Sequence, residues 1–258
     1  MSETVETLMQ GASDLARLAG GIALEYFREE VAVETKHDGS PVTVADRRAE
    51  EFARDWIARR FPRDGILGEE FGTQQSGAAR RWIIDPIDGT KAFIRGVPLW
   101  GTLVAVAEGK HVLAGAAFFP AVNELVTAGD GTGCWWNGSA CAVSTVPDME
   151  RATVLTTDDR FPGNDVRGAA WRALVADAGV CRTWGDCYGY LLVATGRAEV
   201  MVDNTISPWD VAAFAPIISE AGGILTDWDG ARTAFGGGAI ATNAALAGVV
   251  RRALGVPA

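Results

Sequence analysis

Apolar residues recur at helical spacing in the first part of the chain. They fall on one face over residues 3–30 and again over 45–61, and Pro62 follows the second stretch directly. A recurrence every three to four residues predicts an amphipathic helix, and a proline just beyond it is a usual stop signal. The chain is therefore expected to begin with two helices, joined through a loop at 36–43.

Shorter apolar runs follow, and they are typical of strands. One covers residues 65–71 and ends in acidic residues, a polar loop is expected at 73–80, and Trp82, Ile83 and Ile84 form the next run. Gly, Pro and Asn punctuate the following runs, which predicts strands in an antiparallel meander. These runs cover residues 101–109, 111–120 and 124–131.

The stretch STVPDME near residues 145–150 is read as a linker, and the pattern changes after it. Runs typical of strands then alternate with helical ones, an order that indicates an α/β layer. The predicted strands are 152–157, 198–203, ILTDWDG and GAIATN, and 180–186 is predicted as a strand that runs into a loop. The predicted helices are 166–179, 188–196, 209–223 and ALAGVVRRALG. We therefore predict an α+β part over residues 1–145 and an α/β part over 146–258.

Composition and charge restrict the possible partners. The 258 residues are 48% hydrophobic and 22% charged, as in ordinary soluble globular proteins. The net charge of −10 argues against nucleic-acid binding, which needs a basic surface. It does not exclude an anionic substrate, because bound divalent cations reverse the local field.

The sequence also favours a cytoplasmic protein with no membrane partner. No apolar run approaches the roughly 20 residues that span a bilayer, and the N-terminus lacks the features of a secretion signal. The cysteine spacings match no zinc pattern, so we expect reduced thiols. The cysteines are Cys134, Cys141, Cys181 and Cys187.

The stretch WIIDPIDGT carries the first candidate chemistry. Asp85 and Asp88 stand three residues apart around Pro86, directly after a buried-strand run. Two carboxylates so close raise each other's pKa unless a cation lies between them. Asp, Pro and Gly also favour turns, so a plain turn remains the alternative to a metal site.

Acidic residues recur at the ends of three other predicted elements. Asp46 begins the second helix, Glu69 and Glu70 end a strand, and Asp210 lies in the first turn of a helix. Each has an ordinary explanation alone, such as a helix-dipole interaction for Asp210 or a solvated strand end for the glutamates. Together with WIIDPIDGT they predict a site for Mg²⁺, which prefers carboxylate and carbonyl oxygens.

The residues after the second aspartate add an anion-binding element. Gly89 and Thr90 are followed by KAFI, which could begin a helical turn. Backbone N–H groups at such a point can receive an anion. A threonine hydroxyl beside a carboxylate could also orient an attacking water.

Four motifs of the chain resemble those of a known family. VTVAD (42–46), GEE (68–70), DPIDGT (85–90) and PWDVAA…EAGG (208–223) resemble, in this order, the inositol monophosphatase-like, lithium-sensitive, Mg²⁺-dependent phosphatases. The resemblance implies a layered αβαβα sandwich, a homodimer, inhibition by lithium and direct attack by water on a small phosphorylated substrate.

The resemblance also implies a set of metal ligands. Glu69 and Asp85, with the Ile87 carbonyl, would hold one Mg²⁺, and Asp85, Asp88 and Asp210 would hold a second. By the same resemblance, the site would hold two or three Mg²⁺ ions. Two such metals clamp the attacking and leaving oxygens of an in-line displacement.

Catalytic and phosphate-binding roles follow from the same resemblance. Asp46 and Thr90 would activate the water, with Glu69 as a further catalytic residue. Asp88 and the amides of Gly89 and Thr90 would hold the phosphate. The transition state then needs charge stabilisation more than covalent chemistry.

Two flanking stretches suggest the substrate. KAFIRGVPLWGTLVAV (91–106) and TWGDCYGYLLVATGRAEVMVD (183–203) resemble the histidinol-phosphatase branch of the family. Histidinol phosphate carries an ammonium and an imidazole, which suit carboxylates and aromatic faces. The expected substrate-binding residues are Asp186, Asp203, Tyr188 and Trp184, although the two aromatics could equally be packed in the core.

Several alternatives stay open. The substrate could be inositol 1-phosphate, or the enzyme could accept a range of sugar and nucleotide phosphates. Lys91 and Arg95 could meet a second phosphate, form a solvated face or pair with acidic residues at a dimer contact. A non-catalytic metal-binding regulatory protein would be expected to lack Thr90, Asp46 or Glu69, and all three are present.

Overall fold

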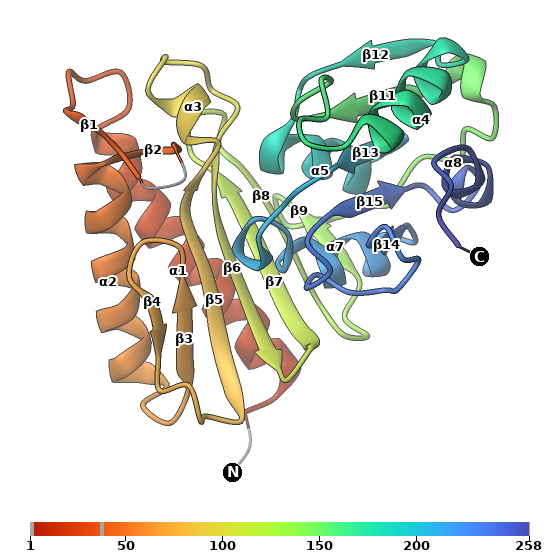
Figure 1. The fold of residues 1–258 in the computed structure, drawn as a ribbon. Helices are drawn as coiled ribbons and strands as arrows, with labels where there is room; N and C mark the ends of the chain where they lie inside the picture. The colour runs from red at the N-terminus through yellow and green to blue at the C-terminus, as the bar shows by residue number, and fades with distance from the viewer. Residues whose placement is uncertain (1–2, 37–38, 258) are drawn as a thin grey trace.

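The computed structural model describes residues 3–36 and 39–257. Its helices and strands form five layers, in which two β-sheets alternate with three layers of helices (Figure 1). The layered αβαβα sandwich expected from the sequence is therefore confirmed.

The first helical layer covers one face of an eight-stranded sheet. It consists of α1 (Val5–Glu25) and α2 (Val44–Arg60), which pack together and against the sheet. The strand order is β10-β9-β8-β7-β6-β5-β3-β4. The strands are β3 (Gly65–Gly68), β4 (Gly72–Gln74), β5 (Arg80–Asp88), β6 (Gly101–Glu108), β7 (His111–Phe119), β8 (Glu124–Gly129), β9 (Cys134–Trp136) and β10 (Ser139–Ala140).

This sheet is buried on both faces, which explains its continuous apolar runs. Trp82 and Ile84 of β5 point to the core beneath α1 and α2, whereas Ile83 points to the core on the other face. Strands β5 to β8 pair antiparallel with their sequence neighbours, so the predicted meander is confirmed.

The second sheet has five strands in the order β12-β11-β13-β15-β14. Strand β11 runs parallel to β12 and β13, and β15 runs antiparallel to β13 and β14. The strands are β11 (Thr153–Thr156), β12 (Val180–Arg182), β13 (Val200–Asp203), β14 (Ile224–Thr226) and β15 (Ala239–Thr242), and a 3₁₀ turn, η1 (Met149–Arg151), precedes them.

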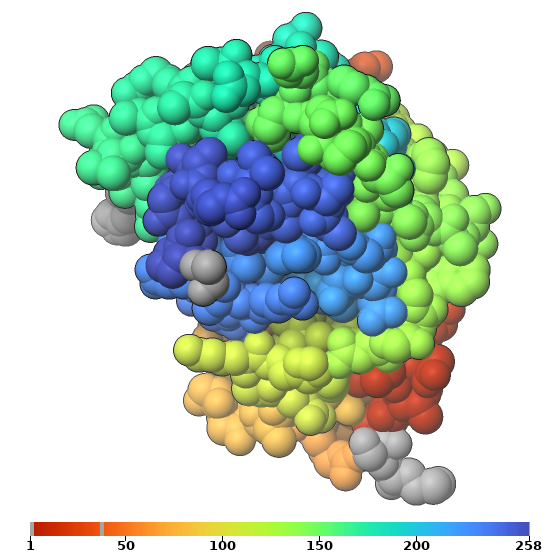
Figure 2. Space-filling view, turned by 90° about the vertical axis from the view of Figure 1, so that its right-hand side faces the viewer, coloured from red at the N-terminus to blue at the C-terminus, as the bar shows by residue number. Residues whose placement is uncertain are grey.

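The remaining helices lie between the sheets or outside the second sheet. Helices α5 (Asp186–Ala194) and α7 (Phe214–Glu220) share a buried apolar cluster with residues of both sheets. Helices α4 (Asp165–Ala176) and α8 (Ala247–Ala253) cover the outer face of the second sheet. Figure 2 shows the C-terminal part of the chain, in blue, packed against the green segments of the middle part.

Five short strands depart from the sequence predictions. Strand β1 (Val33–Thr35) pairs with β2 (Pro41–Thr43), so the loop predicted at 36–43 is wrong over its last three residues. Residues 37 and 38 of that loop lie outside the described part of the chain. Strand β4 enters the predicted loop at 73–80, and the hairpin β9–β10 was not predicted. These strands are too short to give a periodic pattern.

Two helix predictions also need correction. The first helix ends at Glu25 rather than at residue 30, and Arg28 beyond it adopts a φ of +70°. The single helix predicted over 209–223 is two helices, α6 (Pro208–Val211) and α7. Pro216 lacks the N–H that would bond to the Ala212 carbonyl, so the ladder of helical hydrogen bonds is interrupted between α6 and α7.

The proposed boundary between residues 145 and 146 lies in the connection between the sheets. The last strand of the first sheet ends at Ala140 and the first strand of the second begins at Thr153. Helix α7 nevertheless packs against β7 and β8, so the two parts share one core. Within the described residues, no helix combines the length and apolarity needed to cross a membrane.

Candidate active site

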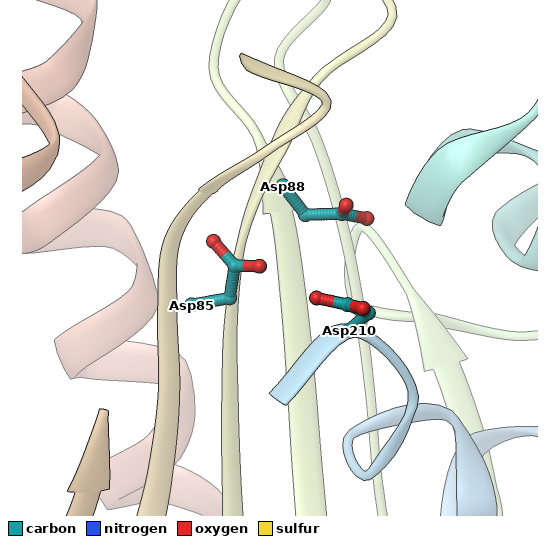
Figure 3. Close-up of side chains that lie close together, drawn as sticks. All are labelled: Asp85, Asp88 and Asp210. Carbon is teal, nitrogen blue, oxygen red and sulfur yellow. The ribbon is translucent and has the colours of Figure 1, made fainter. Parts of the chain in front are cut away.

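Three carboxylates converge where β5 ends. Asp85 and Asp88 come from β5 and Asp210 from α6, and one oxygen of each lies within 4.8 Å of the others (Figure 3). Asp85 pairs with Leu103 of β6 but Asp88 pairs with Gly101, so β5 has one extra residue in this interval. This bulge turns both aspartates to the same face, which a regular strand would not do at a spacing of three.

Backbone amides fix one oxygen of each carboxylate. Ile87 N donates to Asp85 Oδ1 at 3.0 Å, Cys187 N to Asp88 Oδ2 at 2.6 Å, and Ser207 N to Asp210 Oδ2 at 2.8 Å. The last bond belongs to a capping box that begins α6. The cluster is thus positioned by a bulge, by the start of α5 and by the start of α6.

The burial and charge of the cluster favour the binding of a cation. Asp85 is 1% exposed and Asp88 is 8% exposed. Burial first, and then the neighbouring carboxylates, raise the pKa of Asp85 and of Asp88 well above the usual range, and burial raises the pKa of Asp210 to about 7. Buried like charges are unfavourable unless they are neutralised, and oxygen donors of this type suit a hard divalent cation.

A second group contains the predicted water-activating residues. Asp46 is fully buried, and its Oδ2 accepts bonds from Thr43 N at 2.8 Å and Thr43 Oγ1 at 2.7 Å in the capping box of α2. Thr90 Oγ1 lies 3.5 Å from Asp46 Oδ1 and 3.0 Å from the Ile87 carbonyl. Burial raises the pKa of Asp46. The structure therefore brings Asp46, Thr90 and Ile87 together.

Glu69 lies beside the three-aspartate cluster and is paired with a lysine. Lys36 Nζ is 2.7 Å from Glu69 Oε1 and 2.6 Å from Glu70 Oε1. Burial raises the pKa of Glu70 to about 7, although Lys36 opposes this. Lys36 was not predicted as a site residue, because it is far from both glutamates in sequence and has no local motif.

The turn after β5 requires a glycine. Gly89 has a φ of +86°, and a Cβ atom there would lie 2.8 Å from the Leu99 carbonyl oxygen. The Gly89 carbonyl accepts bonds from Ala92 N and Phe93 N, so the predicted helical turn is confirmed as α3 (Thr90–Phe93). The role of Gly89 and Thr90 in phosphate binding stays a prediction.

A cavity of about 80 Å³ extends from the cluster toward the second sheet. It joins Asp88 and Asp210 to the predicted substrate residues Asp186 and Asp203. Its lining consists of Asp88, Thr157, Asp186, Asp203, Thr205, Ile206 and Asp210. Sequence reasoning missed both threonines. Thr157 follows β11, which runs parallel to β13, and such strand ends commonly carry ligand-binding residues.

The two cavity aspartates differ in their environment. Asp203 accepts hydrogen bonds on both oxygens, from Thr157 N at 3.2 Å and from the Tyr190 hydroxyl at 2.8 Å. Burial raises the pKa of Asp186 to about 6, Asp203 adds to this rise, and Lys91 opposes it. Asp203 is therefore held by its neighbours, and the role of either aspartate in substrate binding stays a prediction.

The predicted aromatic residues lie elsewhere. The Tyr188 hydroxyl donates to Glu124 at 3.1 Å and its ring packs edge-on against Phe119. Trp184 is 44% exposed, and the Arg182 guanidinium is 6.0 Å from its ring. Neither residue lines the cavity, so their role in substrate binding stays a prediction.

Comparison with known proteins agrees with this geometry. Residues 4–254 match the model of the inositol monophosphatase family. A histidinol-phosphatase of Chlorobaculum parvum is 45% identical over 92% of this chain and 93% of its own length. A histidinol-phosphatase of Mycobacterium tuberculosis is 36% identical, covering 84% and 85%. The structure of an inositol monophosphatase from Zymomonas mobilis superposes with a TM-score of 0.88 at 30% identity, covering 99% and 100%.

Proposed function

The chain belongs to the inositol monophosphatase family, and from this premise we propose that it converts histidinol phosphate and water to histidinol and phosphate. The enzyme class, a phosphoric monoester hydrolase, follows from its relatives. The choice of substrate rests on one observation. The cavity beside the three-aspartate cluster is lined by two further carboxylates, those of Asp186 and Asp203. An acidic pocket suits a substrate whose alcohol part is cationic.

We infer that the acidic cluster holds Mg²⁺. Asp85, Asp88 and Asp210 would bind one ion, and Asp85, Glu69 and the Ile87 carbonyl would bind another. When bound, the ions neutralise the carboxylates and stabilise charge on the phosphoryl group in the transition state. Glu69 has to share its carboxylate between this role and its ion pair with Lys36.

The water-activating step is assigned to Thr90 and Asp46. The Thr90 hydroxyl donates to the Ile87 carbonyl at 3.0 Å, and Asp46 Oδ1 lies 3.5 Å away. When the hydroxyl turns its proton to Asp46 Oδ1, its oxygen is free to accept a hydrogen bond from the attacking water. As the water attacks phosphorus opposite the ester oxygen, its proton passes to Thr90 Oγ1 while the Thr90 proton moves to Asp46. The raised pKa of Asp46 suits it to accept that proton.

A non-catalytic regulatory role has no support from the site. Asp46, Thr90 and Glu69, the residues whose loss would mark such a protein, are all present and lie around the same carboxylate cluster. The proposal also includes a homodimer, a cytoplasmic location and sensitivity to lithium, which rest on the family resemblance.

Substrate ranking tests the proposed function. We expect kcat/KM for L-histidinol phosphate to exceed that for inositol 1-phosphate, fructose 1,6-bisphosphate and adenosine 3′,5′-bisphosphate by about 100-fold, or about 2.7 kcal/mol of transition-state binding. Phosphate release from each ester in Mg²⁺ measures this. Comparable rates on all four would favour the broad-specificity alternative, and a preference for inositol 1-phosphate would assign that substrate instead.

The raised carboxylate pKa values predict an unusual pH dependence. Above the ordinary aspartate pKa near 3.8, the unfolded chain has lost protons that the folded protein still holds on these aspartates. The free energy of unfolding of the metal-free protein should therefore fall as the pH rises from about 4 to about 7. Mg²⁺ should reverse the trend, because it binds the deprotonated carboxylates.

Thermal unfolding in EDTA and in Mg²⁺ across this range gives the measurement. Asp210→Asn should show a weaker fall in EDTA and a smaller gain from Mg²⁺ than the wild type. A gain from Mg²⁺ that does not grow with pH would contradict the metal assignment.

A further inference from the structure

The hairpin β9–β10 places two cysteines directly opposite each other. Trp135 pairs with Ala140, so the next pair along the ladder is Cys134 and Cys141. Cys141 N donates to the Cys134 carbonyl at 3.0 Å, and the two Sγ atoms are 3.4 Å apart. Opposed residues in antiparallel strands have Cα separations of about 4.5–5.5 Å. Disulfides span Cα separations of about 4.4–6.8 Å, so the backbone already suits a bridge.

The two thiols differ in access and in acidity. Cys134 is buried, whereas Cys141 is half-buried and borders solvent. Contact with the Cys134 thiol, and then the positive charge of Arg197, lower the pKa of Cys141. A thiol that is both accessible and more readily ionised is the one that attacks an oxidant first.

The other two cysteines have no such arrangement. Cys187 is fully buried, and its Sγ lies 3.7 Å from the Asp88 carbonyl. Cys181 lies on β12 in the second sheet, away from the hairpin. Within the described residues, Cys134 and Cys141 are the pair whose sulfur atoms are in contact.

We propose that Cys134 and Cys141 form a reversible disulfide when the protein meets a low-molecular-weight organic disulfide. The Cys141 thiolate attacks one sulfur of that molecule, which breaks its S–S bond, forms a mixed disulfide and releases one thiol. Cys134 then loses its proton and attacks the Cys141 sulfur, forming the protein disulfide and releasing the second thiol. Two protein thiols are oxidised and one small disulfide is reduced to two thiols.

The position of the pair gives the bridge a structural effect. The loop before β9 binds the end of α7, because Gly131 N and Gly133 N donate to the Glu220 carboxylate at 2.9 and 2.8 Å. After the hairpin, Val143 N donates to the Ala221 carbonyl at 2.9 Å. A bridge between Cys134 and Cys141 therefore fastens the edge of the eight-stranded sheet and the start of the connection to the second sheet. We expect it to raise the melting temperature, since it also restricts the unfolded chain.

The test uses the full chain incubated with oxidised glutathione, quenched with acid, alkylated in denaturant and analysed by intact mass and peptide mapping. We expect the wild type to lose two alkylatable thiols out of four, with a cross-link between the peptides that carry Cys134 and Cys141, and dithiothreitol to restore both. Cys181→Ser is the matched control and should form the same cross-link, whereas Cys141→Ser should form none. Separate glutathione adducts without a cross-link, or a cross-link to Cys181 or Cys187, would overturn the proposal.

A melting-temperature comparison tests the structural effect separately. Oxidised wild type and oxidised Cys181→Ser should both melt higher than their reduced forms, whereas Cys141→Ser should melt at the same temperature under both conditions. Equal melting temperatures for cross-linked and reduced wild type would show that the bridge forms but does not fasten the sheet edge. Neither readout depends on the identity of the substrate.

Discussion

Replacement of Asp85 by asparagine should lower kcat/KM by about 10³-fold or more and remove the stabilisation of the protein by Mg²⁺. Asp85 is the carboxylate that both inferred cation positions share, so its loss weakens charge stabilisation worth several kcal/mol in the transition state. The fold should survive, because an asparagine Oδ1 can still accept the bond from Ile87 N. Metal-free stability should even rise, since a buried carboxylate with a raised pKa is replaced by a neutral group.

Phosphate release and thermal unfolding with and without Mg²⁺ provide the two measurements. Asp130→Asn is the matched control, because Asp130 is exposed and pairs with His111 outside the site. That control should retain wild-type turnover and the full Mg²⁺ shift. Substantial turnover by Asp85→Asn would show that the shared-ligand assignment is wrong.

Removal of the Thr90 hydroxyl should reduce turnover far more than metal affinity. Thr90 Oγ1 contacts Asp46 and the Ile87 carbonyl, and general-base assistance of this kind contributes about 10²–10⁴-fold to a rate. We therefore expect kcat of Thr90→Ala to fall within that range. The Mg²⁺ concentration that gives half-maximal activity should change only a few-fold.

Thr90→Ser is the informative companion, since it keeps the hydroxyl and loses only a methyl group. It should retain most of the wild-type kcat. If Thr90→Ser and Thr90→Ala were equally impaired, the methyl group and not the hydroxyl would be the important feature. Equal losses of turnover and metal affinity in Thr90→Ala would assign Thr90 to the metal site instead.

The parts of the fold that the sequence predicted are those with long, uninterrupted patterns. Helix α2 and the meander β6–β8 carry periodic apolar residues over many positions, and the structure has them where they were expected. The short pairs β1–β2 and β9–β10 depend on contacts with other segments, so their residues show no pattern of their own. The predicted helix at 209–223 is divided because Pro216 cannot donate a helical hydrogen bond. The apolar stripe on either side of Pro216 does not show this interruption.

The site shows the same contrast between local motifs and distant contacts. Asp85 and Asp88 could be found because the motif that holds them is contiguous. Lys36 and Thr157 could not be found in this way, because only the fold brings them to the site. Lys36 pairs there with Glu69, and Thr157 N donates to Asp203. Sequence spacing also could not show that Tyr188 bonds to Glu124, since the two residues meet only where α5 packs against the first sheet.

The bond from Cys187 N to Asp88 has a consequence for when activity is acquired. A chain that has emerged from the ribosome only as far as β10 has Asp85 and Asp88, but it lacks the amide that fixes one of them and the third carboxylate at residue 210. A folding intermediate that lacks α5 and α6 therefore has only part of the cluster. The complete cluster therefore exists only after Asp210 has been synthesised. Local unfolding of α5 or α6 would remove one of these groups from the cluster.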